Sequence, residues 1–366
     1  MQSIDVGLEG RGYSIHVGHG ILPQLGRYCQ KLELGRQVAV ITDKAVAPGY
    51  LSSASASLNA AGYEVLEVVF SGGDAAKNMQ TAEHVFGQLI EARMDRSAWI
   101  LALGGGVVGD LAGFVAATFL RGVTYVQVPT TIVAQVDASI GGKTAVNHRL
   151  GKNLIGVFHQ PGMVFTDTGA LRTLPHRELV AGLAEVVKHA IIRDAELFEF
   201  LEAHLDQIVA LQLEPESLDW LIARNVRIKA GVVEADEREG GLRAILNYGH
   251  TIGHAIEAAT GEYEYRHGEA VILGMIGAGE IARHQGLWSA AEQQRQDALL
   301  QRLGVPSGLA QVPVELIVER TRADKKRIDG KSRLILGRRI GEVEIVDDIE
   351  EEVVRAGVEF IQQHYG

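Results

Sequence analysis

The first half of the chain alternates short apolar runs with segments of helical periodicity, and this alternation limits the fold more than any other feature. Strands are expected at 36–43, 63–70, 98–106 and 124–131, with helices at 48–61, 77–93 and 107–119. Apolar strands that alternate with helices are typical of a parallel sheet covered on both faces. We therefore expect an α/β, nucleotide-binding fold in this part of the chain.

The pattern changes near Leu174, after which helical periodicity dominates. Successive segments with a hydrophobic period close to 3.6 residues predict helices. A short hairpin over 332–347 and a final helix to Gly366 complete the chain. A length of 366 residues suffices for two domains at about 150 residues each. We expect an α/β nucleotide-binding domain over 1–174 and a mainly α-helical domain over 175–366.

Charge and composition exclude several classes of protein. A net charge of −11 argues against a nucleic-acid-binding surface. No apolar run approaches the roughly 18 residues of a membrane span, and the N-terminal residues lack the pattern of a signal peptide. The single cysteine, Cys29, suits a reducing compartment and is expected to be a small buried apolar residue. We expect a cytoplasmic protein that binds neither nucleic acid nor membranes.

Three successive glycines, Gly104 to Gly106, end a predicted strand and open a helix. Backbone N–H groups at such a helix N-terminus can cradle a pyrophosphate, and glycine allows its close approach. The GxGxxG fingerprint is absent, so a plain strand-to-helix turn is the alternative. Asp43, at the end of an earlier strand, is placed to accept hydrogen bonds from a ribose.

Two histidines, His250 and His254, are one helical turn apart, and His267 follows shortly after. Residues i and i+4 share a helix face, and imidazole is a common metal ligand. A catalytic zinc takes three protein ligands and keeps one position open, and Glu185 is a suitable acidic ligand upstream. Spacing alone favours His250 and His254 as ligands, although a pair of this kind is more often structural.

Six long motifs resemble the 3-dehydroquinate synthase family of sugar-phosphate cyclases, from about Asp43 to Arg333. They are GGGVVGDLAGFVAATFLRG, VPTTIVAQVDASIGGKTAVN, GKNLIGVFHQP, GLAEVVKHAII, ADEREGGLRAILNYGHTIGHAIE and RHGEAV. The resemblance implies a homodimeric lyase of the shikimate pathway that uses NAD and zinc, with cobalt as an alternative metal. Its anionic substrate is 3-deoxy-D-arabino-heptulosonate 7-phosphate. Transient oxidation, phosphate elimination, reduction and an aldol closure give 3-dehydroquinate.

The resemblance also assigns residues. It makes Glu185, His250 and His267 the metal ligands and moves His254 to the substrate phosphate, against the reading from spacing. The other phosphate contacts are Lys152, Asn153, Asn247, either Lys325 or Lys326, and Arg121 from a neighbouring subunit. The carboxylate and ring contacts are Lys143, Lys188, Lys229, Arg243 and Asn247, with Asp137 on a hydroxyl. The NAD contacts are Asp43, Asp74, Lys77, Gly105, Gly106, Val107, Asp110, Thr130, Thr131, Lys143, Lys152 and Thr173. Asp74 stands where the family commonly has glutamate, so its ribose contact has a shorter side chain.

Two enzyme classes compete with this reading. Other sugar-phosphate cyclases act on substrates without a carboxylate, and the carboxylate-reading positions of Lys229, Arg243 and Asn247 argue against them. Iron-type alcohol and glycerol dehydrogenases share the layout and the glycine loop, but they do not need so many anion-binding groups. A non-catalytic nucleotide-binding protein is disfavoured because the site is complete.

Overall fold

The computed structural model describes residues 1–261, 265–322 and 332–366. By compactness the chain divides into two units, unit 1 (Met1–Leu174 and Leu213–Arg238) and unit 2 (Pro175–Gln212 and Glu239–Gly366). The first segment of unit 1 ends at Leu174, but unit 1 also contains the later segment 213–238. The predicted division into domains 1–174 and 175–366 therefore stays a prediction.

Unit 1 is built on a seven-stranded sheet with the order β1-β2-β9-β6-β5-β3-β4. Its strands are β1 Gln2–Val6, β2 Tyr13–Gly18, β3 Gln37–Asp43, β4 Glu64–Phe70, β5 Trp99–Gly104, β6 Tyr125–Pro129 and β9 Met163–Asp167. Only β1 runs antiparallel to its neighbour, and the remaining pairs are parallel. The expected parallel sheet is therefore confirmed, and a central strand such as β5 is buried at every residue.

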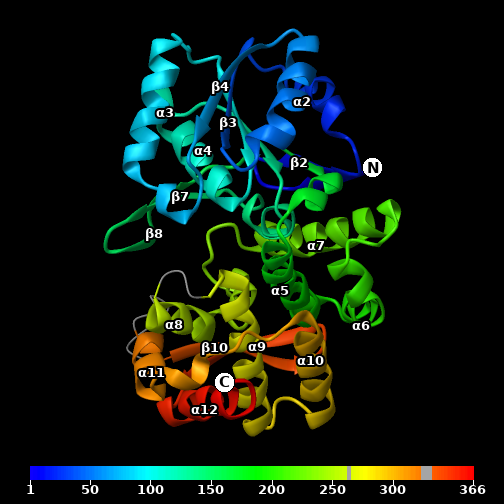
Figure 1. Cartoon of the computed structure of the whole chain (residues 1–366), viewed down its shortest axis with the longest axis vertical. Coiled ribbons are helices and arrows are strands. Elements are labelled where there is room, and N and C mark those ends of the chain that lie inside the picture. Colours follow the sequence, from blue (N-terminus) through cyan, green and yellow to red (C-terminus); the bar gives the residue numbers. More distant parts are fainter. Residues whose placement is uncertain (262–264, 323–331) are drawn as a thin grey trace. The chain divides into compact units, whose positions relative to one another are not determined.

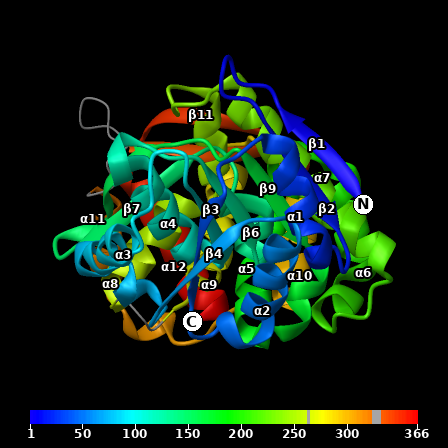
Figure 2. The same cartoon turned by 90° about the horizontal axis from the view of Figure 1, so that it is seen from above.

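Different helices cover the two faces of this sheet. The helices of unit 1 are α1 Leu25–Cys29, α2 Ala47–Ala60, α3 Met79–Glu91, α4 Gly106–Thr118 and α7 Pro215–Ala235. In β3, Val38 and Val40 pack in the cluster with α1 and α2, whereas Ala39 and Ile41 pack in the cluster with α3 and α4. Figure 2 shows these two helix pairs on opposite sides of β3 and β4. The alternation follows from the two-residue period of a strand.

Two further features of unit 1 follow β6. The first is a single turn of π-helix, Ala134–Ala138, against which α7 packs. The second is the antiparallel hairpin of β7 (Lys143–His148) and β8 (Gly151–Phe158). Helix α7 also packs on β1 and β2, which explains its place in unit 1.

Unit 2 is mainly helical and is arranged around α9. Its elements are α5 His176–Arg193, α6 Ala195–Val209, α8 His250–Thr260, α9 His267–His284, α10 Ala290–Leu303, α11 Val314–Arg322, β10 Ser332–Arg339, β11 Glu342–Ile349 and α12 Glu351–Tyr365. Helix α9 is buried along most of its length and contacts α5, α8, α10, α12 and β10 (Figure 1). The hairpin predicted over 332–347 is confirmed as β10–β11.

Glycines let the helices of unit 2 approach closely. A Cβ atom on Gly268 would lie 1.7 Å from the carbonyl oxygen of Ala181, and one on Gly274 would lie 1.9 Å from the carbonyl oxygen of Gly249. Only glycine fits at these crossings of α9 with α5 and with the start of α8. The first residues of α8 and α9 are therefore held beside the middle of α5.

Cys29 is buried, which confirms its expected burial, and burial raises the pKa of its thiol to about 12. Within residues 1–261, 265–322 and 332–366, no helix has the length and apolar character needed to cross a membrane.

Candidate active site

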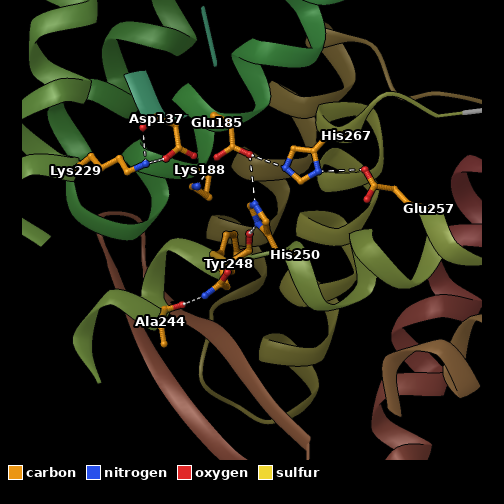
Figure 3. Close-up of polar contacts among 10 residues, drawn as sticks. Asp137, Glu185, Lys188, Lys229, Ala244, Tyr248, His250, Glu257 and His267 are labelled. Carbon is orange, nitrogen blue, oxygen red and sulfur yellow. Dashed lines mark hydrogen bonds and ion pairs between the residues drawn. The ribbon is translucent and has the colours of Figure 1, made fainter. Parts of the chain in front are cut away.

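One carboxylate and two imidazoles meet in unit 2. Glu185 lies in the middle of α5, while His250 and His267 are the first residues of α8 and α9. Glu185 Oε1 lies 3.4 Å from His250 Nε2 and 3.5 Å from His267 Nε2 (Figure 3). These pairs come from three elements that the glycine crossings hold together. They are the three ligands expected from the family resemblance.

The geometry of this cluster fits a tetrahedral metal ion. Bonds of about 2.0–2.1 Å to nitrogen or oxygen separate neighbouring ligand atoms by about 3.3–3.4 Å. The two separations from Glu185 Oε1 are close to that value, and they are long for hydrogen bonds. Glu185 Oε1 is buried and, within the described part of the chain, makes no hydrogen bond of normal geometry. A buried carboxylate oxygen with two imidazole nitrogens at this spacing is a suitable donor set for zinc.

The far side of each imidazole also has a partner. His250 Nδ1 lies 3.1 Å from the carbonyl oxygen of Tyr248, and His267 Nδ1 lies 3.1 Å from Glu257 Oε1. When Nδ1 donates to these acceptors, Nε2 carries the lone pair that a metal requires. In that tautomer both rings turn Nε2, the atom that would bind a metal, toward the same carboxylate oxygen of Glu185.

The ionisation states follow from burial and charge. Burial by itself raises the pKa of the Glu185 carboxyl, but Lys188 and His250 outweigh it and hold the pKa well below its ordinary value. Burial also lowers the pKa of His250, which favours its neutral form. Desolvation lowers the pKa of His267, but contacts with Glu185 and Glu257 outweigh this effect and raise the pKa to about 10.

Buried cations lie close to this cluster in the sequence and in the fold. Lys188 is 1% exposed and forms an ion pair with Glu185. Arg243 is also 1% exposed and lies on a short helix, Leu242–Asn247, that precedes α8. Asn247 donates from Nδ2 to Glu239 Oε1 at 3.0 Å. Two buried cationic side chains beside the cluster make this region suited to an anionic ligand.

The third histidine of the sequence pattern joins the group. Donor atoms of His250, His254 and His267 lie within 4.8 Å of one another. The structure therefore brings together the three histidines that the sequence analysis singled out. The spacing and the family resemblance differ only in which of these histidines bind the metal.

The glycine loop of unit 1 fits a dinucleotide. Gly104 ends β5, Gly105 caps α4, and a Cβ atom on Gly105 would lie 2.9 Å from Thr131 Cγ2. Thr130 Oγ1, which follows β6, is buried and has no hydrogen-bond partner among the residues that the structure describes. The bare helix N-terminus and this unsatisfied hydroxyl lie at the carboxyl ends of neighbouring parallel strands, where such folds bind nucleotides.

Other residues expected to contact NAD have defined partners in unit 1. Asp43 Oδ1 accepts from the backbone of Ala45 and Val46 at 2.8 and 2.9 Å. Thr131 Oγ1 accepts from Ala134 at 3.2 Å. Thr173 Oγ1 lies 2.5 Å from the hydroxyl of Tyr50, a residue that the sequence did not single out.

A lysine connects the expected NAD and phosphate residues of unit 1. Lys77 Nζ lies 2.7 Å from Asp110 Oδ2 and 2.5 Å from Asn153 Oδ1. Burial raises the pKa of Asp110, although the charge of Lys77 opposes the shift. Lys152 pairs with Asp74 at 3.3 Å, so the shorter acid at this position has a cationic partner.

Asp137 lies on the π-helix, and Lys229 of α7 binds it through both its carboxylate and its backbone carbonyl (Figure 3). Single π-turns are frequent at functional sites. Arg121 and Lys143 are exposed, and Arg121 has a positive φ of 72°. Lys325 and Lys326 lie outside the described residues.

The sequence pattern missed two residues beside the histidines, Tyr248 and Glu257. Glu257 lies seven residues after His250 and three after His254 on α8, so helical spacing alone could have found it. The contact with the backbone carbonyl of Tyr248 has no signal in the sequence, because every residue type has a backbone carbonyl.

Solved structures define the class of protein first. A 2-epi-5-epi-valiolone synthase from Streptomyces hygroscopicus subsp. jinggangensis 5008, with NAD⁺ and Zn²⁺ bound, superposes with a TM-score of 0.88 at 30% identity, covering 96% of this chain and 97% of that one. A 2-deoxy-scyllo-inosose synthase complexed with carbaglucose-6-phosphate, NAD⁺ and Co²⁺ gives a TM-score of 0.87 at 28% identity, covering 98% and 99%. A probable glycerol dehydrogenase from Sinorhizobium meliloti 1021, at 18% identity, a TM-score of 0.65 and coverage of 94% and 95%, shares the fold alone. The chain therefore has the fold of the sugar-phosphate cyclases.

Sequence relatives then give the family. Family models described as 3-dehydroquinate synthase N-terminal and C-terminal match residues 67–181 and 182–327. The 3-dehydroquinate synthase of Nostoc punctiforme is 46% identical over 355 residues, which cover 96% of this chain and 97% of that protein. The 3-dehydroquinate synthase of Pseudomonas syringae pv. tomato is 47% identical over 357 residues, covering 97% and 96%. The chain belongs to the 3-dehydroquinate synthase family.

Proposed function

We propose that the enzyme converts 3-deoxy-D-arabino-heptulosonate 7-phosphate into 3-dehydroquinate and inorganic phosphate, with NAD and zinc as cofactors. The observation that carries this proposal is the donor set of Glu185, His250 and His267 at metal-ligand spacing, beside the buried cation of Lys188. Cobalt is an alternative metal, because imidazole and carboxylate ligands also suit it.

The residues of the chain hold two cofactors with separate tasks. Zinc, when bound, supplies a Lewis acid for the substrate hydroxyls. NAD, when bound, would supply reversible hydride transfer at carbon C5, so that the reaction is redox-neutral overall. We assign NAD to the backbone of Gly105 and Gly106 and to the side chains and backbone of Asp43, Asp74, Lys77, Val107, Asp110, Thr130, Thr131, Lys143, Lys152 and Thr173.

The remaining polar residues bind the two anionic ends of the substrate. We assign its phosphate to Lys152, Asn153, Asn247 and His254, with a lysine of 325–326, and its carboxylate and ring to Lys143, Lys188, Lys229, Arg243 and Asn247. Charge-assisted hydrogen bonds from several cations explain how a protein with a net charge of −11 binds a multiply charged anion. Such a set of cations is not needed to oxidise a simple alcohol.

The elimination step uses the substrate's own phosphate. None of the residues assigned here is a dedicated strong base, so the leaving phosphate takes the C6 proton as its C–O bond breaks. The chain contributes position and charge, and Asp137, held by Lys229, accepts from a substrate hydroxyl. A carbaphosphonate analogue that cannot leave should still exchange its C6 proton with deuterium. Absence of exchange would contradict this step.

The enzyme acts as a homodimer in which Arg121 of one subunit reaches the phosphate bound by its partner. The β7–β8 hairpin supports this assembly, because it exposes Leu150 (72%), Leu154 (41%), Val157 (42%) and Phe158 (41%). Exposed large apolar side chains on one hairpin are suited to an interface. We place the dimer in the cytoplasm, which the single buried thiol supports. Light scattering should give twice the chain mass for the wild type and a lower mass for Phe158→Glu; a monomeric wild type would contradict the assembly.

The substrate assignment is tested by comparing two classes of substrate in separate reactions. The enzyme, supplied with NAD and zinc, is given either the heptulosonate phosphate or a sugar phosphate that lacks the carboxylate. We expect phosphate release and 3-dehydroquinate only from the first. Release from the second substrate alone would assign the enzyme to another cyclase reaction.

A further inference from the structure

Glu257 connects the metal-ligand cluster to the surface of unit 2. Its side chain is 21% exposed, and its Oε1 lies 3.1 Å from His267 Nδ1. The opposite nitrogen of the same ring, Nε2, lies 3.5 Å from Glu185 Oε1. Figure 3 shows the His267 ring between these two carboxylates. One imidazole therefore bridges a proposed metal ligand and an acid that is not one.

The two proposed histidine ligands differ in their outer partners. His250 faces a neutral acceptor, the carbonyl oxygen of Tyr248, at 3.1 Å. His267 faces an anionic acceptor at the same distance. A carboxylate behind a ligating histidine fixes its tautomer, orients its ring and makes it a more basic ligand than a carbonyl does. The difference between the rings thus depends on Glu257.

The fold explains why Glu257 reaches His267. Glu257 lies on α8, two turns after His250, whereas His267 opens α9. The helices pack closely, since a Cβ atom on Gly253 of α8 would lie 3.0 Å from the carbonyl oxygen of Ala270 of α9. This close crossing places an acid of one helix against the first ring of the other.

We propose that Glu257 is a positioning residue that holds His267 as the Nδ1–H tautomer and thereby sets the affinity of the site for zinc. The inference rests on the proposed metal site and adds a residue that does not touch the metal. Loss of such outer partners typically weakens metal binding by about 10- to 100-fold.

The test measures zinc affinity in metal-free protein by competition with a chromophoric chelator. Glu257→Gln keeps an acceptor oxygen but removes the charge, and Glu257→Ala removes both. We expect zinc affinity to fall about tenfold in the first variant and up to about 100-fold in the second. The visible absorption of bound Co²⁺ should change as well, because a misplaced His267 alters the ligand field.

Glu202→Gln is the matched control. Glu202 is 32% exposed and pairs with Arg295 instead of a histidine. The variant therefore loses an ion pair of unit 2 without affecting a proposed metal ligand. Its zinc affinity and cobalt spectrum should equal those of the wild type. Circular dichroism checks the fold, and Glu257→Gln decides the question if Glu257→Ala is unfolded.

Two failures can be told apart. Wild-type zinc affinity and cobalt spectra in a folded Glu257→Gln, together with a wild type that binds zinc, would overturn the role of Glu257 alone. A wild type that binds no zinc would instead overturn the proposed metal site, and the inference with it.

Discussion

Replacing Lys188 by methionine should destabilise the metal-free enzyme much more than the zinc-loaded enzyme. Lys188 is 1% exposed and pairs with Glu185, which is equally buried. Removing one partner of a buried pair costs about 3–5 kcal/mol, because the other charge is left without compensation. The cost should be near the lower limit, since His267, with a pKa of about 10, remains a cationic neighbour of Glu185.

Zinc changes this balance because it brings positive charge to the same carboxylate. Without metal, a loss of about 3 kcal/mol corresponds to a fall in Tm of about 6–12 °C for a folding unit of roughly this size. With saturating zinc the deficit should shrink to a fraction of that value. The assay is thermal unfolding followed by circular dichroism, with and without zinc.

A matched surface substitution separates this effect from the loss of any cation. Arg302 pairs with Asp206 at 3.2 Å, but both side chains are well exposed at 38% and 82%. Such pairs contribute about 0–1 kcal/mol, so Arg302→Met should change Tm little and independently of zinc. An equal deficit of Lys188→Met in both metal states, or no deficit in either, would refute the reasoning.

Three further predictions concern stability and substrate binding. Burial raises the pKa of Asp297 from 3.8 to about 6, so this acid costs stability as pH rises from about 4 to 6. The free energy of unfolding of Asp297→Asn, measured with denaturant, should therefore exceed that of the wild type by up to about 3 kcal/mol above pH 6 and should equal it below pH 4. A gain that does not depend on pH would contradict this. Arg243→Ala should raise KM about 30-fold or more in steady-state kinetics, since the substrate carboxylate loses a buried charged partner. An unchanged KM would count against the proposed contact of Arg243 with the substrate. Gly268→Ala forces a Cβ atom against Ala181 and should lower the free energy of unfolding by about 1–3 kcal/mol or more. Gly231→Ala, in open space on α7, should be neutral or stabilising in the same assay. Equal effects of the two substitutions would contradict the tight crossing at Gly268.

Sequence periodicity predicted the centre of unit 1 because its signals are local. The strands β3, β4, β5 and β6 agree with expectation to within about two residues at most ends, as do the helices between them. Each strand is an apolar run between helical segments, so no distant partner was needed to recognise it.

Strands β1, β2, β8 and β9 were not predicted, and helix α7 was predicted but could not be assigned to unit 1. β1 and β2 pair with each other, and β9 is buried only because it lies between β2 and β6. Most residues of β8 are exposed or half-buried, so its sequence has no buried-strand pattern. Helix α7 resembles the other amphipathic helices, and only its contacts with β1 and β2 place it in unit 1.

The candidate site shows the same limit. Helical spacing brought His250 and His254 together but could not place Glu185, because α5 meets α8 and α9 only through tertiary packing. The approach of Gly268 to Ala181, which brings these helices together, is a contact across 87 residues of chain. The family resemblance carried this long-range information, and the spacing of the donor atoms supports it.

The most direct test of the central claim follows phosphate release and NADH absorbance together. The enzyme is given the heptulosonate phosphate, NAD and zinc, with and without a chelator. We expect phosphate release that stops with the chelator and no net NADH, because the hydride is returned to the substrate. Net NADH formation, or phosphate release that is indifferent to the chelator, would contradict a redox-neutral cyclase with a metal at Glu185, His250 and His267.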